Sequence, residues 1–200
     1  MLISLNLERA LRWAATCHRG QDRKGSGVPY VQHVVAVAII LDRLGYGEDV
    51  VVAGLLHDVV EDCDVTLGDV RDRFGVEVAA LVAIGSEVKL DANGSKRPWI
   101  DRKRDHIAAL ADAPPDARAV VLADKLHNLA SIACDLREGR PVWSQFNAER
   151  DQVLWYYQAV MDALAAGHEA DPKLARLVTE CRRALDEVEA LGGPSGTPGG

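Results

Sequence analysis

The sequence predicts an all-α fold, a single helical bundle of about eight to ten helices. Apolar residues recur at helical spacing, as Leu7, Leu11 and Ala14 do in the first segment. Glycine, proline and capping residues stand where such segments would begin and end. The chain has 200 residues, of which 48% are hydrophobic, which is enough for one sizeable core and too few for two independent catalytic domains.

The helical pattern continues along the chain and is punctuated by recognisable caps. Asn6 is the expected cap of the first helix. Thr66 and Asp69 have the spacing of a capping box, and Asp171 is an expected N-cap before Pro172 at a first helical position. In chain order the predicted helices span residues 7–19, 31–44, 48–60, 66–75, 76–88, 99–111, 116–137, 143–166 and 172–191.

Residues 1–191 are expected to form one domain, with a polar loop at 91–98 between two of its helices. Residues 192–200, GGPSGTPGG, contain no side chain larger than proline or threonine. Such a segment cannot bury enough apolar area to offset the entropy of ordering it. We therefore expect a disordered tail rich in Gly, Pro and Ser.

The charge balance narrows the classes of partner. The chain has 23 Lys and Arg against 30 Asp and Glu, a formal charge of −7. Proteins that bind nucleic acids or anionic membranes in general rely on a broad positive field. We therefore expect no nucleic-acid or membrane partner, and any polyanionic ligand must be held by a local cluster of basic residues.

Apolar runs and cysteines indicate the compartment. The longest uninterrupted apolar run, residues 34–41, has eight residues, whereas crossing a bilayer takes about 20. The N-terminus lacks the basic-then-apolar pattern of a signal peptide. We expect a soluble, cytoplasmic protein. The four cysteines contain no CxxC pair and are expected to be reduced thiols: Cys17, Cys63, Cys134 and Cys181.

Histidines and acidic residues lie in or beside the apolar helices. An ionised carboxylate in an apolar interior needs a partner, a shifted pKa or a cation, and a divalent metal would satisfy all of these groups at once. Two imidazoles with two carboxylates suit Mn²⁺, Fe²⁺ or Zn²⁺ better than Ca²⁺, and leave positions for water and substrate. The residues are His33, His57, Asp58, Glu61, Asp62 and Asp124.

Their spacing favours a shared site. His57 and Glu61, like Asp58 and Asp62, are four residues apart and would share one face of a helix. Asp124 is followed by histidine and asparagine at the third and fourth positions, which repeats that spacing on a second helix. The two groups converge if the two helices pack face to face.

The ordered set of motifs resembles a known family. The chain contains Arg23-Lys24, Pro29-Tyr30 and His33, then LLHDVVED at 55–62, VTLxDVxxxFG at 65–75 and LADKLHNL at 122–129. Over roughly residues 5 to 165 it resembles the hydrolase domain of RelA/SpoT proteins, within the HD superfamily. It is most similar to small stand-alone hydrolases such as the metazoan SpoT homologues, because no length remains for a synthetase or regulatory domain.

The resemblance implies a Mn²⁺-dependent hydrolase that removes the 3′-pyrophosphate of guanosine tetra- or pentaphosphate, with Fe²⁺ or Zn²⁺ as other candidate metals. The partner would be a small guanine nucleotide. The positions that match the family's metal ligands are His33, His57, Asp58 and Asp124. Glu61 and Asp62 match the acidic pair that positions and deprotonates the attacking water. The matching substrate-binding positions are Asn128 and the basic pair Arg23 and Lys24.

Charge clusters agree with this chemistry, because phosphoryl transfer needs cations around the phosphate oxygens. Residues 57–72 carry six acids against one arginine, whereas residues 94–106 carry five bases against two aspartates. We interpret the basic loop with Arg23 and Lys24, together with Lys103, as local phosphate clamps. Lys96 and Arg97 are interpreted as solvated.

Two other functions stay open at this stage. The stretch 85–98 matches the family poorly, so the substrate could be another phosphorylated nucleotide, such as NADPH or a nucleoside triphosphate, with the same metal chemistry. A catalytically silent nucleotide-binding regulator would usually have lost a ligand or the acidic pair, and this sequence retains all of them. The oligomeric state does not follow from the sequence.

Overall fold

The computed structural model describes residues 3–85, 93–165 and 171–192. All regular structure in these ranges is helical, apart from one isolated β-bridge between Asp22 and Pro29. The all-α prediction is confirmed. The helices are α1 (Leu5–Cys17), α2 (Val31–Arg43), α3 (Glu48–Leu56), α4 (Val59–Asp62), α5 (Leu67–Phe74), α6 (Val76–Gly85), α7 (Trp99–Leu110), α8 (Pro115–Arg137), the 3₁₀ turn η1 (Trp143–Gln145), α9 (Arg150–Ala165) and α10 (Pro172–Leu191).

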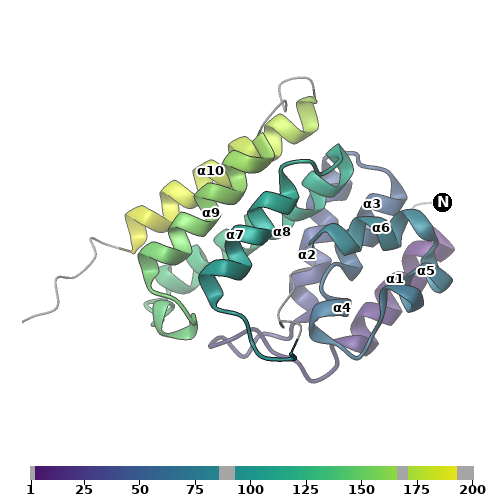
Figure 1. Ribbon diagram of the computed structural model, residues 1–200, viewed down its shortest axis with the longest axis horizontal. Helices are drawn as coiled ribbons and strands as arrows, with labels where there is room; N and C mark the ends of the chain where they lie inside the picture. Colours follow the sequence, from purple (N-terminus) through teal and green to yellow (C-terminus); the bar gives the residue numbers. More distant parts are fainter. Residues whose placement is uncertain (1–2, 86–92, 166–170, 193–200) are drawn as a thin grey trace, which may run out of the picture.

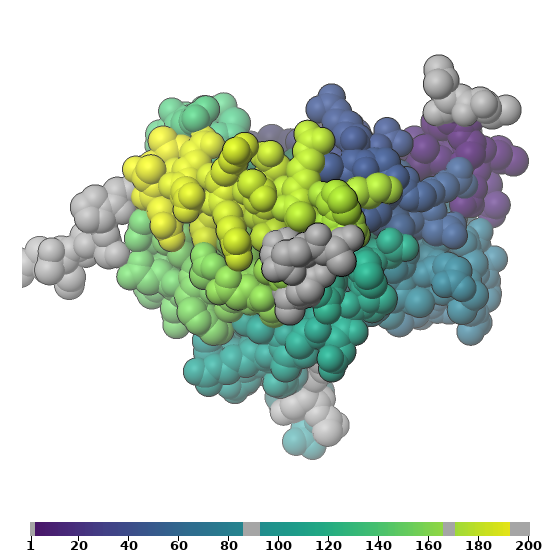
Figure 2. All heavy atoms as spheres, turned by 90° about the horizontal axis from the view of Figure 1, so that it is seen from above, coloured from purple at the N-terminus to yellow at the C-terminus, as the bar shows by residue number. Residues whose placement is uncertain are grey.

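Helices α3 and α8 form the centre of the bundle (Figure 1). Every residue of α3 from Val50 to Leu56 is buried, because α1, α2, α6 and α8 surround it. The long helix α8 packs against α2 and α3 on one side and against α10 on the other. Figure 2 shows α10 lying along one face of the molecule beside α9. The face-to-face packing on which the predicted site depends is therefore present between α3 and α8.

Several predicted helix ends are confirmed. The side chain of Thr66 accepts a hydrogen bond from the Asp69 amide while the Asp69 carboxylate accepts one from the Thr66 amide, which completes the capping box. Gly75 ends that helix at φ 96°, a conformation that favours glycine. Asp171 accepts hydrogen bonds from the first amides of α10, and Pro172 occupies the first turn.

Two predictions of helix limits are wrong at the chain's beginning and near its end. Ser4, not Asn6, caps α1, because the Ser4 hydroxyl oxygen accepts a hydrogen bond from the Leu7 amide at 3.0 Å. The predicted helix 143–166 is interrupted: a single 3₁₀ turn is followed by extended backbone at Phe146, and α9 begins at Arg150. The centres of the Trp143 and Phe146 rings lie 6.1 Å apart, and the extended backbone at Phe146 allows the two rings to pack.

The predicted helix 48–60 also breaks, at two of the predicted metal ligands. It ends at Leu56, and His57 and Asp58 form a turn before α4. The His57 Nδ1–H donates to the carbonyl oxygen of Gly54 at 2.8 Å. That carbonyl is one of the last four of α3, which have no partner further along the helix. The side chain thus caps the helix end from which it projects.

Some predictions lie outside the described residues: the end of the predicted helix 76–88, the start of the loop 91–98, and the tail beyond Gly192. The four cysteines are free thiols, as expected. None of the helices in the described ranges is long and apolar enough to cross a membrane.

Gly54 permits the close approach of α3 to α2, and its replacement should destabilise the fold. A Cβ atom at Gly54 would lie 2.6 Å from Leu41 Cδ1 in the core. Gly54→Ala is expected to lower the free energy of unfolding by about 1–3 kcal/mol, measured by urea denaturation. Gly68→Ala is the matched control, because a Cβ there meets nothing closer than 3.4 Å. Equal stability of the Gly54 variant and wild type would contradict this account of the packing.

Candidate metal centre and adjoining cavity

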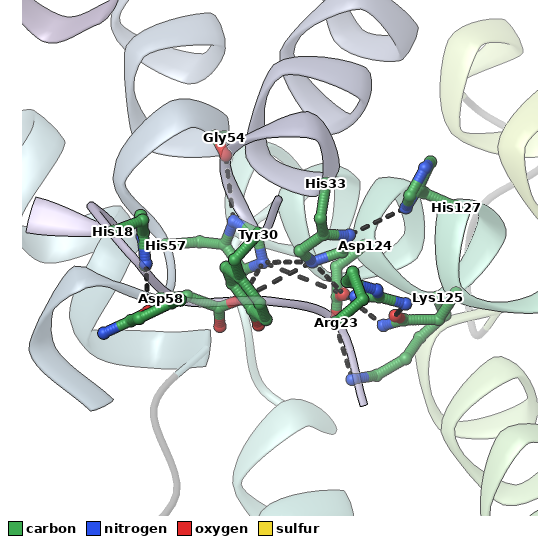
Figure 3. A network of polar contacts seen from close by, with 12 residues as sticks. His18, Arg23, Tyr30, His33, Gly54, His57, Asp58, Asp124, Lys125 and His127 are labelled. Atoms are coloured by element: carbon green, nitrogen blue, oxygen red, sulfur yellow. Dashed lines mark hydrogen bonds and ion pairs between the residues drawn. The ribbon is translucent and has the colours of Figure 1, made fainter. Parts of the chain in front are cut away.

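Four predicted metal ligands meet at the centre of the bundle (Figure 3). His33 projects from the first turn of α2, His57 and Asp58 from the turn between α3 and α4, and Asp124 from the middle of α8. His33 is almost fully buried, with 1% of its surface exposed, and His57 is also buried. Three separate segments of the chain therefore contribute side chains to one point.

The potential ligand atoms face one another closely. His33 Nε2 lies 3.2 Å from His57 Nε2, 3.4 Å from Asp58 Oδ2 and 3.2 Å from Asp124 Oδ1. His57 Nε2 lies 3.1 Å and 3.7 Å from the same two oxygens. Among the described residues, His33, His57 and Asp58 form a group whose ligand atoms all lie within 4.8 Å of one another. Two imidazole nitrogens and two carboxylate oxygens suit a divalent transition metal.

The backbone fixes the orientation of one imidazole. Because the His57 Nδ1–H donates to the Gly54 carbonyl oxygen, the His57 Nε2 atom faces the cluster. A hydrogen bond from the distant ring nitrogen is the usual way in which proteins orient a metal-binding histidine. The helix break therefore serves the site, because a continuous helix would pair the same carbonyl with a backbone amide.

The charges of the cluster depend on one another. Burial disfavours the charged form of His57, but the carboxylates of Asp58 and Asp124 outweigh it and raise the pKa of His57 well above its ordinary value. Burial likewise opposes ionisation of Asp58, yet His57 and the hydrogen bond from His33 hold the pKa of Asp58 well below its usual range. The cluster thus keeps its carboxylates ionised and attracts positive charge.

Two neighbours of the cluster, Tyr30 and Lys125, stand in motifs of the sequence but were given no role at the site. The Tyr30 hydroxyl donates to Asp58 Oδ2 at 2.6 Å, and burial together with Asp58 raises the pKa of Tyr30. Lys125 donates to Asp124 Oδ2 at 2.7 Å, and its attraction to Asp124 outweighs burial and raises the pKa of Lys125. Lys125 stands in the 122–129 motif, next to Asp124. Tyr30 binds the same Asp58 oxygen that faces the imidazoles, whereas Lys125 binds the Asp124 oxygen that does not face them.

The acidic pair lies at the edge of the cluster. Glu61 and Asp62 belong to the short helix α4, and the Asp62 amide donates to the Asp58 carbonyl oxygen at 2.9 Å. Both side chains line a small cavity of about 190 Å³ that also contains the four candidate ligands. The pair is therefore close to the candidate metal without being part of the tight group of ligand atoms.

A larger cavity of about 720 Å³ adjoins the small one. The two share Tyr30, Asp62 and Asn128 as lining residues. The larger cavity is bounded by the basic loop on one side and by residues 145–147 on the other. At Gly25, where φ is +74°, a Cβ atom would collide with the Gln145 side chain, so glycine allows the two walls to meet.

The predicted substrate-binding residues line these cavities. Arg23 and Lys24 line the larger one, where the Arg23 guanidinium donates to Asn128 Oδ1 at 2.8 Å and lies over the Tyr30 ring. Lys103 lines the small cavity, and its ammonium lies 4.2 Å from the centre of the Tyr156 ring.

Two basic residues that the sequence analysis interpreted as solvated differ from one another. Lys96 lines the larger cavity, so its position is that of a further candidate contact for an anion. Arg97 does not line either cavity and pairs with Asp105. Their adjacency in the sequence gave no means of telling the two apart.

Comparison with known proteins places this architecture in a family. The family model for the HD domain matches residues 10–154, which is more than half of the chain. The chain belongs to the HD-domain family. Membership of the HD-domain family implies a divalent metal, and the His33, His57, Asp58 and Asp124 donor set fits one.

Individual HD-domain relatives are small enzymes of similar length. The chain is 36% identical to the Mus musculus protein named guanosine-3′,5′-bis(diphosphate) 3′-pyrophosphohydrolase MESH1, over 87% of this chain and 93% of the mouse protein. It is 38% identical to the Drosophila melanogaster protein of the same name, over 80% and 86% of the two chains. A solved structure of a metazoan SpoT orthologue that hydrolyses ppGpp aligns with a TM-score of 0.74 and 32% identity, covering 92% of this chain and 96% of that one. These similarities confirm the resemblance to small RelA/SpoT-type hydrolases.

Binding of a divalent metal should release protons. The raised pKa of His57 means that its Nε2 holds a proton at pH values above about 6.5, the ordinary pKa of histidine. A metal must displace that proton, so apparent affinity should rise with pH, by up to about tenfold per unit. Calorimetric titration of Mn²⁺ in buffers of different ionisation enthalpy measures the protons released. Affinity that is the same at pH 6.5 and pH 8 would contradict this charge assignment.

Proposed function

We propose that this protein is a Mn²⁺-dependent hydrolase that removes the 3′-pyrophosphate of guanosine tetra- or pentaphosphate in the cytoplasm. The observation that carries the proposal is the arrangement of the two cavities. The candidate metal ligands and an acidic pair line a small cavity that opens, at Tyr30, Asp62 and Asn128, into a larger one with basic walls. The names and activity of the small HD-domain relatives support the same substrate.

The metal would be held by His33, His57, Asp58 and Asp124. When bound there, a divalent ion would neutralise phosphate oxygens and promote ionisation of the attacking water. The mixed nitrogen and oxygen donors accept Mn²⁺, and Fe²⁺ or Zn²⁺ would also fit them. Tyr30 and Lys125 would keep the two carboxylates in place through the hydrogen bonds that they donate.

Glu61 and Asp62 are the candidates for proton transfer. They lie one turn of the chain beyond Asp58, they line the small cavity, and Asp62 stands where the two cavities meet. A carboxylate at that junction can accept the proton of the attacking water as its oxygen bonds to the phosphorus attached to the ribose 3′ oxygen. The bond between that phosphorus and the 3′ oxygen then breaks, and the 3′ oxygen takes up the proton that the carboxylate accepted, which releases pyrophosphate and the nucleotide with a 3′-hydroxyl.

The basic residues divide the substrate between the cavities. Arg23 and Lys24 would hold the nucleotide in the larger cavity, with Asn128 oriented by Arg23. Lys103 would face the 3′-diphosphate in the small cavity. Positively charged groups at both ends would fix the reacting bond between them, and positioning of this kind is a major part of phosphoryl-transfer catalysis.

One assay separates this substrate from its competitors. Purified protein with Mn²⁺ should hydrolyse guanosine tetraphosphate and release pyrophosphate, at a higher kcat/KM than it shows with NADPH or nucleoside triphosphates. Preferred turnover of NADPH or of a triphosphate would retain the metal chemistry and overturn the substrate assignment. Absence of turnover on all three would overturn the enzymatic function.

Substitutions should distinguish the metal ligands from the acidic pair. Asp58→Ala is expected to lose both bound metal and activity. Glu61→Gln and Asp62→Asn cannot accept a proton, a function worth about 10²–10⁴ in rate, and should lose turnover while keeping the metal. Metal content and kcat measured on the same samples test this, with the exposed Asp64→Asn as the control for lost charge. Loss of metal from the Glu61 or Asp62 variant would make that residue a ligand.

Arg23→Ala should weaken substrate binding while the metal stays bound. The substitution removes a cation from the wall of the larger cavity and also the donor that orients Asn128. A rise in KM of about tenfold or more is expected, the usual size for a lost hydrogen bond to a charged group. Arg97→Ala is the matched control, since Arg97 lines neither cavity. An unchanged KM for Arg23→Ala would mean that the basic loop is solvated and does not bind the substrate.

A further inference from the structure

His127 is a buried histidine to which neither the sequence motifs nor the proposed reaction assigns a role. It lies on α8, three residues after Asp124, and 9% of its surface is exposed. Its Nδ1 atom lies 2.7 Å from the Nδ1 atom of His33, with the two ring centres 4.9 Å apart (Figure 3). This short contact lies on the side of the His33 ring that faces away from the candidate metal ligands.

The contact constrains where protons lie. Two ring nitrogens at this distance share one proton, so one of them donates and the other accepts. The opposite nitrogen of His33, Nε2, faces His57 and the two carboxylates at 3.2–3.4 Å. A neutral histidine that binds a metal through Nε2 carries its proton on Nδ1. In the metal-binding state His33 therefore donates, and His127 Nδ1 accepts.

The far side of His127 is compatible with that assignment. If His127 Nδ1 accepts a hydrogen bond, the proton of its own neutral ring is on Nε2. That atom lies 3.3 Å from the side-chain amide of Gln32. A half-turn exchanges the oxygen and nitrogen of an amide, so the Gln32 oxygen can accept from His127. Gln32, His127 and His33 then form a chain of hydrogen bonds that leads to the metal ligand atom.

We propose that His127 is a positioning residue that holds His33 in the tautomer and ring orientation required for metal binding. The inference rests on the metal site of the proposed function. It gives His33 the same kind of support that the Gly54 carbonyl oxygen gives His57. The two histidine ligands would thus be oriented by different means, one by the backbone of its own helix and the other by a side chain from α8.

Metal affinity tests the proposal without any substrate. His127→Phe keeps an aromatic ring but removes the acceptor, whereas the Oδ1 atom of His127→Asn can replace Nδ1. Competition with a chromophoric chelator gives the Kd for Zn²⁺. We expect His127→Phe to raise the Kd by about 10–100-fold, and His127→Asn to restore most of the wild-type affinity. Cys134→Ala, at an exposed position on the same helix, is the control and should leave the Kd unchanged.

The tautomer gives a second measurement that a purely structural role would not predict. In ¹H–¹⁵N spectra of the Zn²⁺-loaded protein, the His127 proton should be on Nε2 and the His33 proton on Nδ1. A His127 proton on Nδ1, or a His127→Phe variant that binds Zn²⁺ as tightly as wild type, would overturn the proposal. Failure of the wild-type protein to bind Zn²⁺ would overturn the metal site itself. If the His127 variants change the Kd for Zn²⁺ as expected but the wild-type protein hydrolyses guanosine tetraphosphate only weakly, the role of His127 is supported and the substrate assignment is overturned.

Discussion

The repulsion between two ionised carboxylates inside an apolar helical bundle is the constraint on which the site depends. Asp58, in the turn after α3, and Asp124, on α8, approach the same pair of imidazoles beside a core of mostly aliphatic residues. An isolated charge in such a place would be too costly to keep. Hydrogen bonds from Tyr30 and Lys125 reduce that cost but use only one oxygen of each carboxylate. The carboxylate oxygens that face the imidazoles, Asp58 Oδ2 and Asp124 Oδ1, define a place for positive charge together with two ring nitrogens.

Local departures from regular structure follow from this constraint. Helix α3 stops at Leu56, four residues before its predicted end, which lets the His57 imidazole bind the Gly54 carbonyl oxygen and turn its other nitrogen to the centre. Gly54 is also the point where α2 comes close enough to bring His33 into reach. The same residue therefore serves the packing and the orientation of a ligand. The core aligns the donors, and the cavity beside them gives access from solvent.

The sequence predicted most of the bundle because helical spacing, capping residues and glycines are local signals. It also placed together the side chains that converge, since the spacing around His57 and Asp124 requires only that α3 and α8 pack. The break at His57 and the interruption after Trp143 could not be predicted in this way, because each depends on a contact made by a side chain in the folded protein. The contacts of Tyr30 and Lys125 with the carboxylates could not be predicted for the same reason, because tertiary structure defines them.

The most direct test of the central claim is to locate the bound cation. A crystal of the protein loaded with Mn²⁺, measured near the manganese absorption edge, would show its position by anomalous scattering. The account predicts one strong peak coordinated by His33, His57, Asp58 and Asp124, with Glu61 and Asp62 beside it and not coordinated. A peak at another place, or the same four side chains left hydrogen-bonded to one another in saturating Mn²⁺, would contradict it.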